Sequence, residues 1–326
     1  MQTPLDAEHR ALGGRMVDFA GWDMPIRYGS VLDEHRACRT AAVVFDVSHM
    51  GSVWMRGSGA FTALQDLLTN DLGGIGPGRA QYTHLLDDEA SVVDDLIVWW
   101  VGEEEFLVIP NASNTAPALA ALQAASGGAD VEDASGERAL LAVQGPEARR
   151  LLAGLAPEAA EVAHFGVSAT TLPGGVSGFV GGTGYTGEDG VELFVPVETA
   201  VDVWRALLEA GVVPAGLGWV VGWDKPTFAG RDALLAEKER GVERRLAGIL
   251  LSDRQVPRAG CSVLIDGEAV GEVTSGNVSP VLERGIALGF LPPGTKPGTA
   301  VEIDIRGRRA SGEVVKPPFI KTAAGR

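Results

Sequence analysis

Two adjacent carboxylates, Asp94 and Asp95, are the residues whose type and spacing most directly offer acid-base or electrostatic chemistry. They open the apolar run at 96–100, which has the composition of a strand. Because neighbouring strand residues point to opposite faces, only one of the two carboxylates can enter a pocket, and the other needs water or a hydrogen-bond donor. The pair indicates either a solvated turn or a carboxylate aimed into a cleft, and the sequence alone favours the turn.

Residues 182–187 (GTGYTG) match the G-x-G-x-x-G pattern of dinucleotide-binding loops. That function requires a helix after the loop, because the helix N-terminus holds the pyrophosphate. Residues 190–195 instead alternate between apolar and polar types, as a strand does. We therefore predict that the glycines shape a pocket between two strands. The alternative is a glycine-rich hairpin connection that binds nothing.

The histidines and cysteines give little support for other kinds of site. The five histidines show no metal-ligand spacing, and no G-x-S-x-G elbow indicates a hydrolase. Cys38 and Cys261 each lack the close Cys or His partner that a zinc site needs. Cys38 is better explained as a small buried apolar residue than as a catalytic thiol, and His49 as a structural histidine. We expect no metal.

Composition limits the partners. The chain has 326 residues, enough for two or three domains, with 45% hydrophobic residues and a net charge of -16. An acidic surface repels phosphate backbones, so we expect no nucleic-acid partner. Residues 1–6 match neither an export signal nor a transit peptide, and no apolar run approaches the roughly 20 residues that cross a bilayer. We expect a cytoplasmic protein that does not enter a membrane.

Hydrophobic spacing predicts an α+β body followed by an all-β domain. Residues 30–42 have helical spacing behind a capping serine, Ser30, and 43–47 form a buried strand with a polar exit at 48–51. From Arg245 onward, short alternating segments with turn pairs indicate a small barrel. The other expected elements are helices at 57–68, 113–125 and 147–153 and strands at 82–86, 92–101, 106–110 and 140–143. Pro146, directly before 147–153, is expected at the first helical position. The expected barrel turns are Asp266-Gly267 and Arg306-Gly307.

Three segments together resemble glycine cleavage T proteins. They are residues 16–25 (MVDFAGWDMP), 45–51 (FDVSHMG) and 183–190 (TGYTGEDG). The resemblance continues at 93–98, 111–114, 144–146 and 274–280, so it covers nearly the whole chain.

The resemblance implies a three-domain cloverleaf whose central opening binds tetrahydrofolate. Its first, folate-binding domain would be discontinuous, at 1–52 and 138–243. The inserted α+β domain would span 53–137, and the C-terminal β-barrel domain 244–326. We expect a monomer.

The resemblance also implies an activity and a site. The activity is an aminomethyltransferase reaction, in which the one-carbon unit of a lipoyl-bound aminomethyl group on H protein passes to tetrahydrofolate with release of ammonia. Asp95 matches the catalytic acid beside the reacting folate nitrogens, and Glu192 matches the glutamate that binds the pterin edge. A carboxylate accepts the adjacent N–H donors of such an edge as a paired contact. The other matching pocket residues are Met50, Tyr82, Asn111 and Tyr185.

The sequence departs from the family after Gly218, which is followed directly by Trp219. The family has an arginine-containing helix and loop at this point, so the chain carries an apparent internal deletion. Loss of that helix and loop should expose apolar surface on the first domain and remove an arginine from the folate site. The alternatives are a catalytically impaired folate-pocket or partner-binding protein and another folate-dependent demethylase of the same fold. The tRNA-linked branch is disfavoured, because its motif is absent and the charge is unsuitable.

Overall fold

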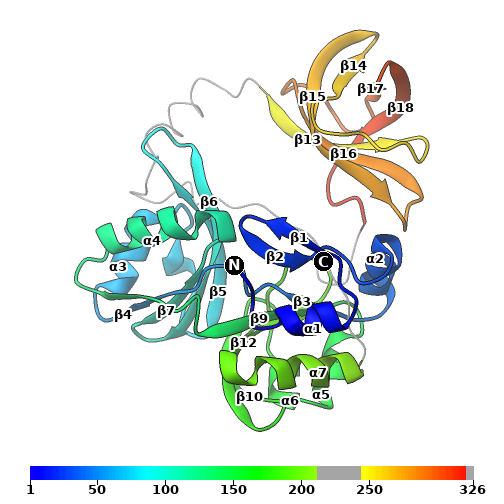
Figure 1. The fold of residues 1–326 in the computed structure, drawn as a ribbon. Helices are drawn as coiled ribbons and strands as arrows, with labels where there is room; N and C mark the ends of the chain where they lie inside the picture. The colour runs from blue at the N-terminus through cyan, green and yellow to red at the C-terminus, as the bar shows by residue number, and fades with distance from the viewer. Residues whose placement is uncertain (211–243, 321–326) are drawn as a thin grey trace. The chain divides into compact units, whose positions relative to one another are not determined.

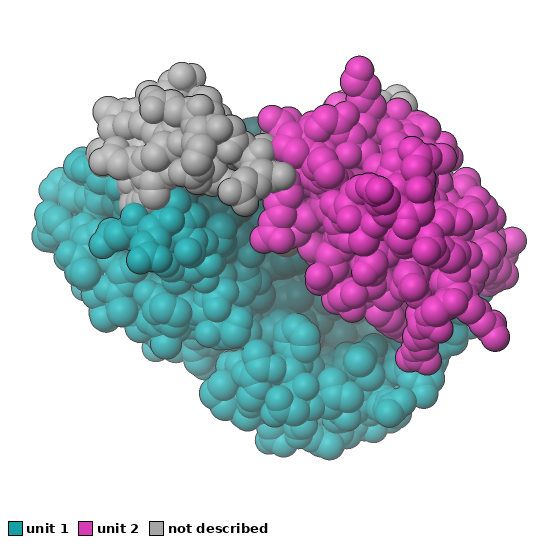
Figure 2. All heavy atoms as spheres, turned by 90° about the horizontal axis from the view of Figure 1, so that it is seen from above, with its two compact units in different colours: residues 1–234, 323–325 teal, residues 235–322, 326 magenta. Residues whose placement is uncertain are grey.

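A computed structural model describes residues 1–210 and 244–320 of the chain. The chain divides into two compact units, residues 1–234 with 323–325 and residues 235–322 with 326 (Figure 2). The first unit contains two five-stranded sheets, and the second contains a closed barrel. The apparent deletion after Gly218 lies outside the described residues.

The first sheet is built from strands that are far apart in the sequence. Its antiparallel order is β10-β11-β12-β9-β3, and all seven residues of β9, which lies between β12 and β3, are buried. Helix α7 packs Val203, Trp204 and Leu207 into the core of this sheet. The strands are β3 (Val43–Asp46), β9 (Arg138–Gln144), β10 (Val167–Leu172), β11 (Val176–Gly181) and β12 (Gly190–Pro196), and the helices that follow β9 and β12 are α5 (Ala148–Ala153), α6 (Pro157–Ala160) and α7 (Ala200–Ala210).

The second sheet comes from one continuous stretch of chain, residues 53–133. Helices α3 and α4 cover one face of it (Figure 1). On the other face, Trp54, Trp99 and Leu107 share a core cluster with Leu140 and Ala142 of β9, so the two sheets pack together. The elements are β4 (Val53–Arg56), α3 (Ala60–Leu67), η1 (Leu72–Gly74), β5 (Arg79–Leu86), β6 (Val92–Gly102), β7 (Glu105–Ile109), η2 (Ala112–Asn114), α4 (Thr115–Ala124) and β8 (Asp130–Asp133).

The N-terminal elements complete the first unit. The predicted cap is confirmed, because the Ser30 hydroxyl accepts a hydrogen bond from the Asp33 amide at 3.4 Å, where helix α2 begins. These elements are α1 (Asp6–Ala11), β1 (Met16–Phe19), β2 (Trp22–Pro25) and α2 (Val31–Thr40), and a short helix η3 (Val197–Thr199) precedes α7.

The barrel of the second unit closes in the order β13-β16-β15-β14-β17-β18. Both predicted hairpin turns are present. Asp266 and Gly267 have φ values of 51° and 86°, and Arg306 and Gly307 have values of 55° and 80°, as a two-residue turn between twisted strands requires. The strands are β13 (Arg245–Leu251), β14 (Ser262–Ile265), β15 (Glu268–Ser279), β16 (Arg284–Leu291), β17 (Ala300–Ile305) and β18 (Arg308–Val315).

Two sequence predictions are wrong in detail. Asp94 and Asp95 do not form a solvated turn, because both lie inside β6. Pro146 is not the first helical residue, since α5 begins at Ala148 with Glu147 as its cap. Within the ranges 1–210 and 244–320, no helix has the length and apolarity needed to cross a membrane.

Candidate active site

Four of the predicted site residues line one cavity between the two sheets of the first unit. Tyr82 comes from β5, Asp95 from β6, Tyr185 from the loop between β11 and β12, and Glu192 from β12. The cavity is small, about 30 Å³. Its remaining walls are mainly apolar and are formed by Leu96, Ile97, Ile109, Leu140 and Gly184.

Asp95 is the half-buried carboxylate of this cavity. The Tyr82 hydroxyl donates a hydrogen bond to its Oδ2 atom. The Asn111 side-chain amide donates to the backbone oxygen of Asp95 at 2.6 Å and to its Oδ1 atom at 3.2 Å. Burial, and after it the hydrogen bond to Asp95, raises the pKa of Tyr82, so the phenol stays protonated and acts as a donor.

Asp94 has a different role, because it points to the other face of β6 and is 1% exposed. Its carboxylate accepts hydrogen bonds from the Asn111 backbone amide at 2.9 Å and from the Asn114 side chain at 2.6 Å. Burial raises the pKa of Asp94, although these hydrogen bonds act to lower it. Asp94 therefore secures the segment that leads into α4.

Glu192 is almost completely buried, with 3% of its surface exposed. The Thr183 hydroxyl donates a hydrogen bond to its Oε2 atom. Burial raises the pKa of Glu192 to about 7, and among the described residues the Thr183 hydrogen bond is the one contribution that lowers it. The carboxyl group is thus close to its titration point at neutral pH.

Tyr185 and Met50 are connected at the side of the cavity, where the Tyr185 hydroxyl donates to the Met50 sulfur at 3.4 Å. Burial raises the pKa of Tyr185, and the Glu192 carboxylate adds to the effect. Tyr185 therefore remains a neutral phenol. Met50 does not line the cavity itself and reaches it through Tyr185, while Asn111 reaches it through Asp95.

Arg138 is a site residue that the sequence reasoning missed. It is 1% exposed and donates to the Ser52 hydroxyl at 2.8 Å and to the backbone oxygens of Ser48 at 3.0 Å and Met50 at 2.5 Å. Burial lowers the pKa of Arg138 to about 10, so it remains charged at neutral pH. The sequence did contain a signal for Arg138, because it is a charged residue at the first position of an otherwise apolar strand. Arg138 fixes the loop that carries Met50.

The structure buries Cys38, as predicted, and places the His49 ring against Phe19. The His49 ring lies edge-on to Phe19 at 5.4 Å, and burial lowers its pKa. Cys38 is fully buried, and burial raises its pKa to about 11, so it remains a thiol.

A larger apolar cavity, about 410 Å³, lies elsewhere in the first unit, and none of the predicted site residues lines it. Tyr28 and Asp46 are in its wall and meet at the buried His9. The Tyr28 hydroxyl lies 2.7 Å from His9 Nδ1, and His9 Nε2 lies 2.9 Å from Asp46 Oδ2. The predicted site residues Asp95, Glu192, Tyr82 and Tyr185 line the smaller cavity instead.

The chemistry available at the smaller cavity is electrostatic and acid-base in kind. Asp95 can stabilise a developing cation or move a proton, with Tyr82 as its neutral hydrogen-bond donor. Glu192 can accept N–H donors from a ligand, and burial makes such charge-assisted hydrogen bonds strong.

Comparisons with known proteins identify the family. A sequence profile of the GCVT N-terminal domain matches residues 5–224, and one of the glycine cleavage T-protein C-terminal barrel domain matches residues 244–321. The chain is 42% identical to the aminomethyltransferases of Mycolicibacterium paratuberculosis and Streptomyces coelicolor, each over 98% of this chain and 97% of the relative. It is 39% identical to that of Geobacillus thermodenitrificans, over 99% of both chains.

The structure agrees with this result. It matches the crystal structure of the glycine cleavage system aminomethyltransferase T from Bartonella henselae with a TM-score of 0.87 and 29% identity, over 98% of both chains. The alignment with the Mycolicibacterium paratuberculosis enzyme runs over 359 residues, more than the 326 of this chain, so that relative has residues without a counterpart here. The chain belongs to the glycine cleavage T-protein family of aminomethyltransferases.

Proposed function

We propose that this aminomethyltransferase takes the aminomethyl group from the lipoyl arm of H protein and passes its carbon to tetrahydrofolate. The products are ammonia, 5,10-methylenetetrahydrofolate and the dihydrolipoyl form of H protein. The observation that carries the proposal is that the carboxyl groups of Asp95 and Glu192 line the same cavity, together with two neutral phenols.

Glu192 is the proposed anchor for the pterin ring. A pterin edge presents adjacent N–H groups, and a carboxylate accepts two such donors side by side. Among the described residues no cation pairs with Glu192, so its charge is free to meet a ligand. Binding of N–H donors favours the ionised form of the carboxyl group.

Asp95 is the proposed catalytic residue. A folate nitrogen bonds to the aminomethyl carbon as the lipoyl sulfur leaves as a thiol, and departure of ammonia then leaves that carbon as a folate iminium cation, whose energy a nearby carboxylate lowers. The same group can also help transfer the proton that the folate nitrogen loses when it bonds to the carbon. Tyr82 and Asn111 hold the Asp95 carboxylate in place from two sides.

Met50 and Tyr185 are proposed to form one side of the pterin site. The contact between the Tyr185 hydroxyl and the Met50 sulfur joins them, and Arg138 fixes the Met50 backbone.

The domain division is also a proposal. The inserted domain at 53–137 is supported by the second sheet, whose strands all lie between Val53 and Asp133. The discontinuous first domain, at 1–52 and 138–243, is supported by the pairing of β3 with β9. Residues 244–326 form the third domain, and the barrel strands from Arg245 to Val315 lie within it. We propose that the enzyme acts as a monomer in the cytoplasm.

The experiment that tests this function is tetrahydrofolate-dependent release of ammonia from aminomethylated H protein. We expect the chain to release ammonia only when tetrahydrofolate and the loaded H protein are both present. Asp95→Asn and Glu192→Gln separate the two roles, because the first should lower kcat and the second should raise KM for tetrahydrofolate. Ammonia release that does not depend on tetrahydrofolate would contradict the proposal.

A further inference from the structure

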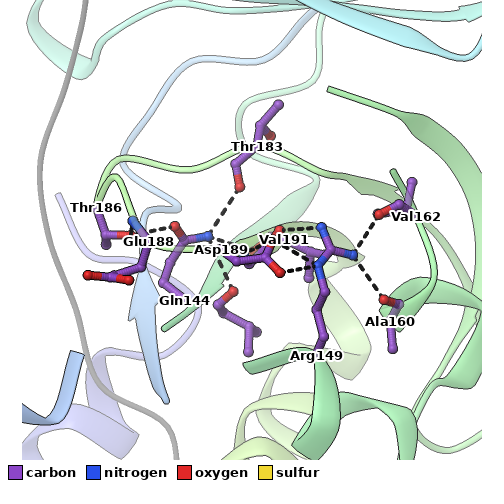
Figure 3. Close-up of polar contacts among 11 residues, drawn as sticks. Gln144, Arg149, Ala160, Val162, Thr183, Thr186, Glu188, Asp189 and Val191 are labelled. Atoms are coloured by element: carbon purple, nitrogen blue, oxygen red, sulfur yellow. Dashed lines mark hydrogen bonds and ion pairs between the residues drawn. The ribbon is translucent and has the colours of Figure 1, made fainter. Parts of the chain in front are cut away.

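The glycine-rich loop between β11 and β12 has a buried partner in Gln144, the last residue of β9. Gln144 is 1% exposed, and its side-chain nitrogen donates to the backbone oxygens of Thr183 at 3.1 Å and Val191 at 3.2 Å. Its side-chain oxygen accepts a hydrogen bond from the Thr186 hydroxyl at 2.9 Å (Figure 3). One amide therefore holds the loop at two points, Thr183 and Thr186, and contacts β12 at Val191.

Two glycines make room for this amide. A Cβ atom on Gly184 would lie 2.0 Å from the side-chain oxygen of Gln144. A Cβ atom on Gly190 would lie 2.7 Å from the side-chain nitrogen of Gln144 and 2.3 Å from the backbone oxygen of Val143. No side chain fits at either position without displacing Gln144. Of the three glycines in the pattern that resembled a nucleotide fingerprint, Gly184 is the one that packs against Gln144, whereas Gly182 packs against the Ala163 backbone oxygen and Gly187 has a φ of 68°.

Arg149 fixes the far end of the same loop. Its guanidinium group pairs with the Asp189 carboxylate at 2.9 Å and donates to the backbone oxygen of Gly190 at 3.1 Å. It also donates to the backbone oxygens of Ala160 at 2.9 Å and Val162 at 2.6 Å (Figure 3). The loop is anchored on both sides before it leads into β12.

The anchored segment carries Tyr185, which lines the cavity, and Thr183, which contacts a residue that lines it. The Thr183 hydroxyl reaches Glu192, and Tyr185 lies between the two threonines that Gln144 holds. Thr183 is 6% exposed and Thr186 is 2% exposed, so neither hydroxyl is freely accessible to water.

We propose that Thr183 is a positioning residue that orients the Glu192 carboxyl group for the pterin edge, and that Gln144 keeps Thr183 in place for this role. The proposal rests on the proposed binding of tetrahydrofolate at Glu192. It assigns a role to Thr183 and Gln144, which do not line the cavity, in positioning Glu192, which does.

The electrostatics around Glu192 support this role. The titratable groups that line the cavity with Glu192 are Tyr185 from the loop, Tyr82 from β5 and Asp95 from β6. These groups are neutral phenols or acids, so none of them favours ionisation of Glu192. Burial raises its pKa to about 7, and the Thr183 hydrogen bond opposes that rise. Removing the hydroxyl should therefore raise the pKa of Glu192 further.

The test uses Thr183→Val, which keeps the shape of the side chain and removes the donor, with Thr183→Ser as the matched control. The Glu192 titration would be followed in the full chain by NMR of side-chain ¹³C-labelled glutamate, assigned with Glu192→Gln. We expect a higher Glu192 titration midpoint in Thr183→Val and the wild-type midpoint in Thr183→Ser. An unchanged midpoint in Thr183→Val would overturn the positioning role, whether or not folate binds.

Tetrahydrofolate binding gives the second readout. Loss of a hydrogen bond to a charged group predicts that Thr183→Val weakens binding by about tenfold or more at neutral pH, with recovery in Thr183→Ser. Equal affinity in wild type and Thr183→Val would also overturn the role. If the titration shifts as expected but wild type does not bind tetrahydrofolate, the result contradicts the proposed function and leaves the Thr183–Glu192 relationship intact.

Gln144→Glu tests the other half of the proposal. The change keeps the size of the side chain but places a carboxylate oxygen against the backbone oxygens of Thr183 and Val191, which repel it. We expect tetrahydrofolate binding to weaken and the Glu192 titration midpoint to rise, as in Thr183→Val. If Gln144→Glu folds and shows wild-type values for both, Gln144 has no part in positioning Thr183.

Discussion

Asp94 and Asp95 are neighbours in β6, yet their carboxylates lie on opposite faces of the strand and have different functions in the structure. Asp94 is buried and accepts hydrogen bonds from the two asparagines that precede α4, Asn111 and Asn114. Asp95 lines the cavity and accepts a hydrogen bond from Tyr82. The alternation of side chains along a strand thus separates a structural carboxylate from a proposed catalytic one.

This relationship predicts that the same substitution has different effects at the two positions. Asp94→Asn places an N–H group against buried donors, which should lower the free energy of unfolding by about 2 kcal/mol. Asp95→Asn keeps an acceptor for Tyr82 and removes the negative charge, so the fold should persist while turnover falls by about a hundredfold or more. Urea unfolding and steady-state ammonia release measure the two effects. A large loss of stability in Asp95→Asn, with turnover intact, would reverse the assignment.

The raised pKa of Glu192 predicts a pH-dependent loss of stability in the absence of ligand. In the unfolded chain this carboxyl group ionises near pH 4.5, whereas in the folded chain its pKa is about 7. Between these values the unfolded state has released the proton and the folded state still binds it, so stability falls as pH rises. Glu192→Gln removes this effect and should be more stable than wild type at pH 8, by about 2 to 3 kcal/mol.

The comparison at pH 4 is the control for that prediction, because both states then retain the Glu192 proton and the advantage of Glu192→Gln should disappear. Thermal unfolding of both proteins across this pH range checks the trend. An advantage of the same size at pH 4 and pH 8 would show that burial of an ionised Glu192 is not its cause.

Arg138 predicts a large effect on stability from a residue outside the cavity. Arg138→Met keeps much of the apolar stem but leaves the backbone oxygens of Ser48 and Met50 without their buried donor. The free energy of unfolding should fall by about 3 kcal/mol or more. Arg205→Met is the matched control, since Arg205 pairs with Glu8 at the surface, and its unfolding midpoint should hardly change. Equal effects of the two changes in chemical denaturation would contradict the role assigned to Arg138.

The buried pair of His9 and Asp46 predicts sensitivity to acid. Burial acts to raise the pKa of Asp46, but hydrogen bonds from His9, Ser48 and Thr3 outweigh it, and the net pKa is lowered. A lowered pKa gives stability that is present above the unfolded value, near pH 4, and lost as pH falls through the folded value. Wild type should therefore lose more stability than Asp46→Asn between pH 5 and pH 3. Parallel acid-unfolding curves for the two proteins would show that Asp46 does not contribute.

Local patterns predicted most of the elements, because helical spacing, strand alternation and two-residue hairpin turns are properties of short segments. The Ser30 cap and the turn at Asp266-Gly267 are examples. The position of Asp94 could not be predicted in this way, since its donors Asn111 and Asn114 lie 17 and 20 residues further along the chain.

The proposed site residues came from the resemblance and not from local spacing. Asp95 lies in one sheet and Glu192 in the other, and no periodicity links two strands nearly a hundred positions apart. Gln144 was missed because its partners are on a loop about 40 residues further along the chain. The cavity lies where the two sheets pack together, and residues far apart in the sequence, such as Trp99 and Leu140, belong to the same core cluster there.

The most direct test of the central claim is a single-turnover measurement with H protein carrying a ¹³C-labelled aminomethyl group. We expect the label to appear in 5,10-methylenetetrahydrofolate with wild-type enzyme, in step with ammonia release, and about a hundredfold or more slowly with Asp95→Asn. Transfer at the wild-type rate by Asp95→Asn would contradict the catalytic role of that carboxylate. Failure of the wild-type chain to transfer the label would contradict the proposed reaction itself.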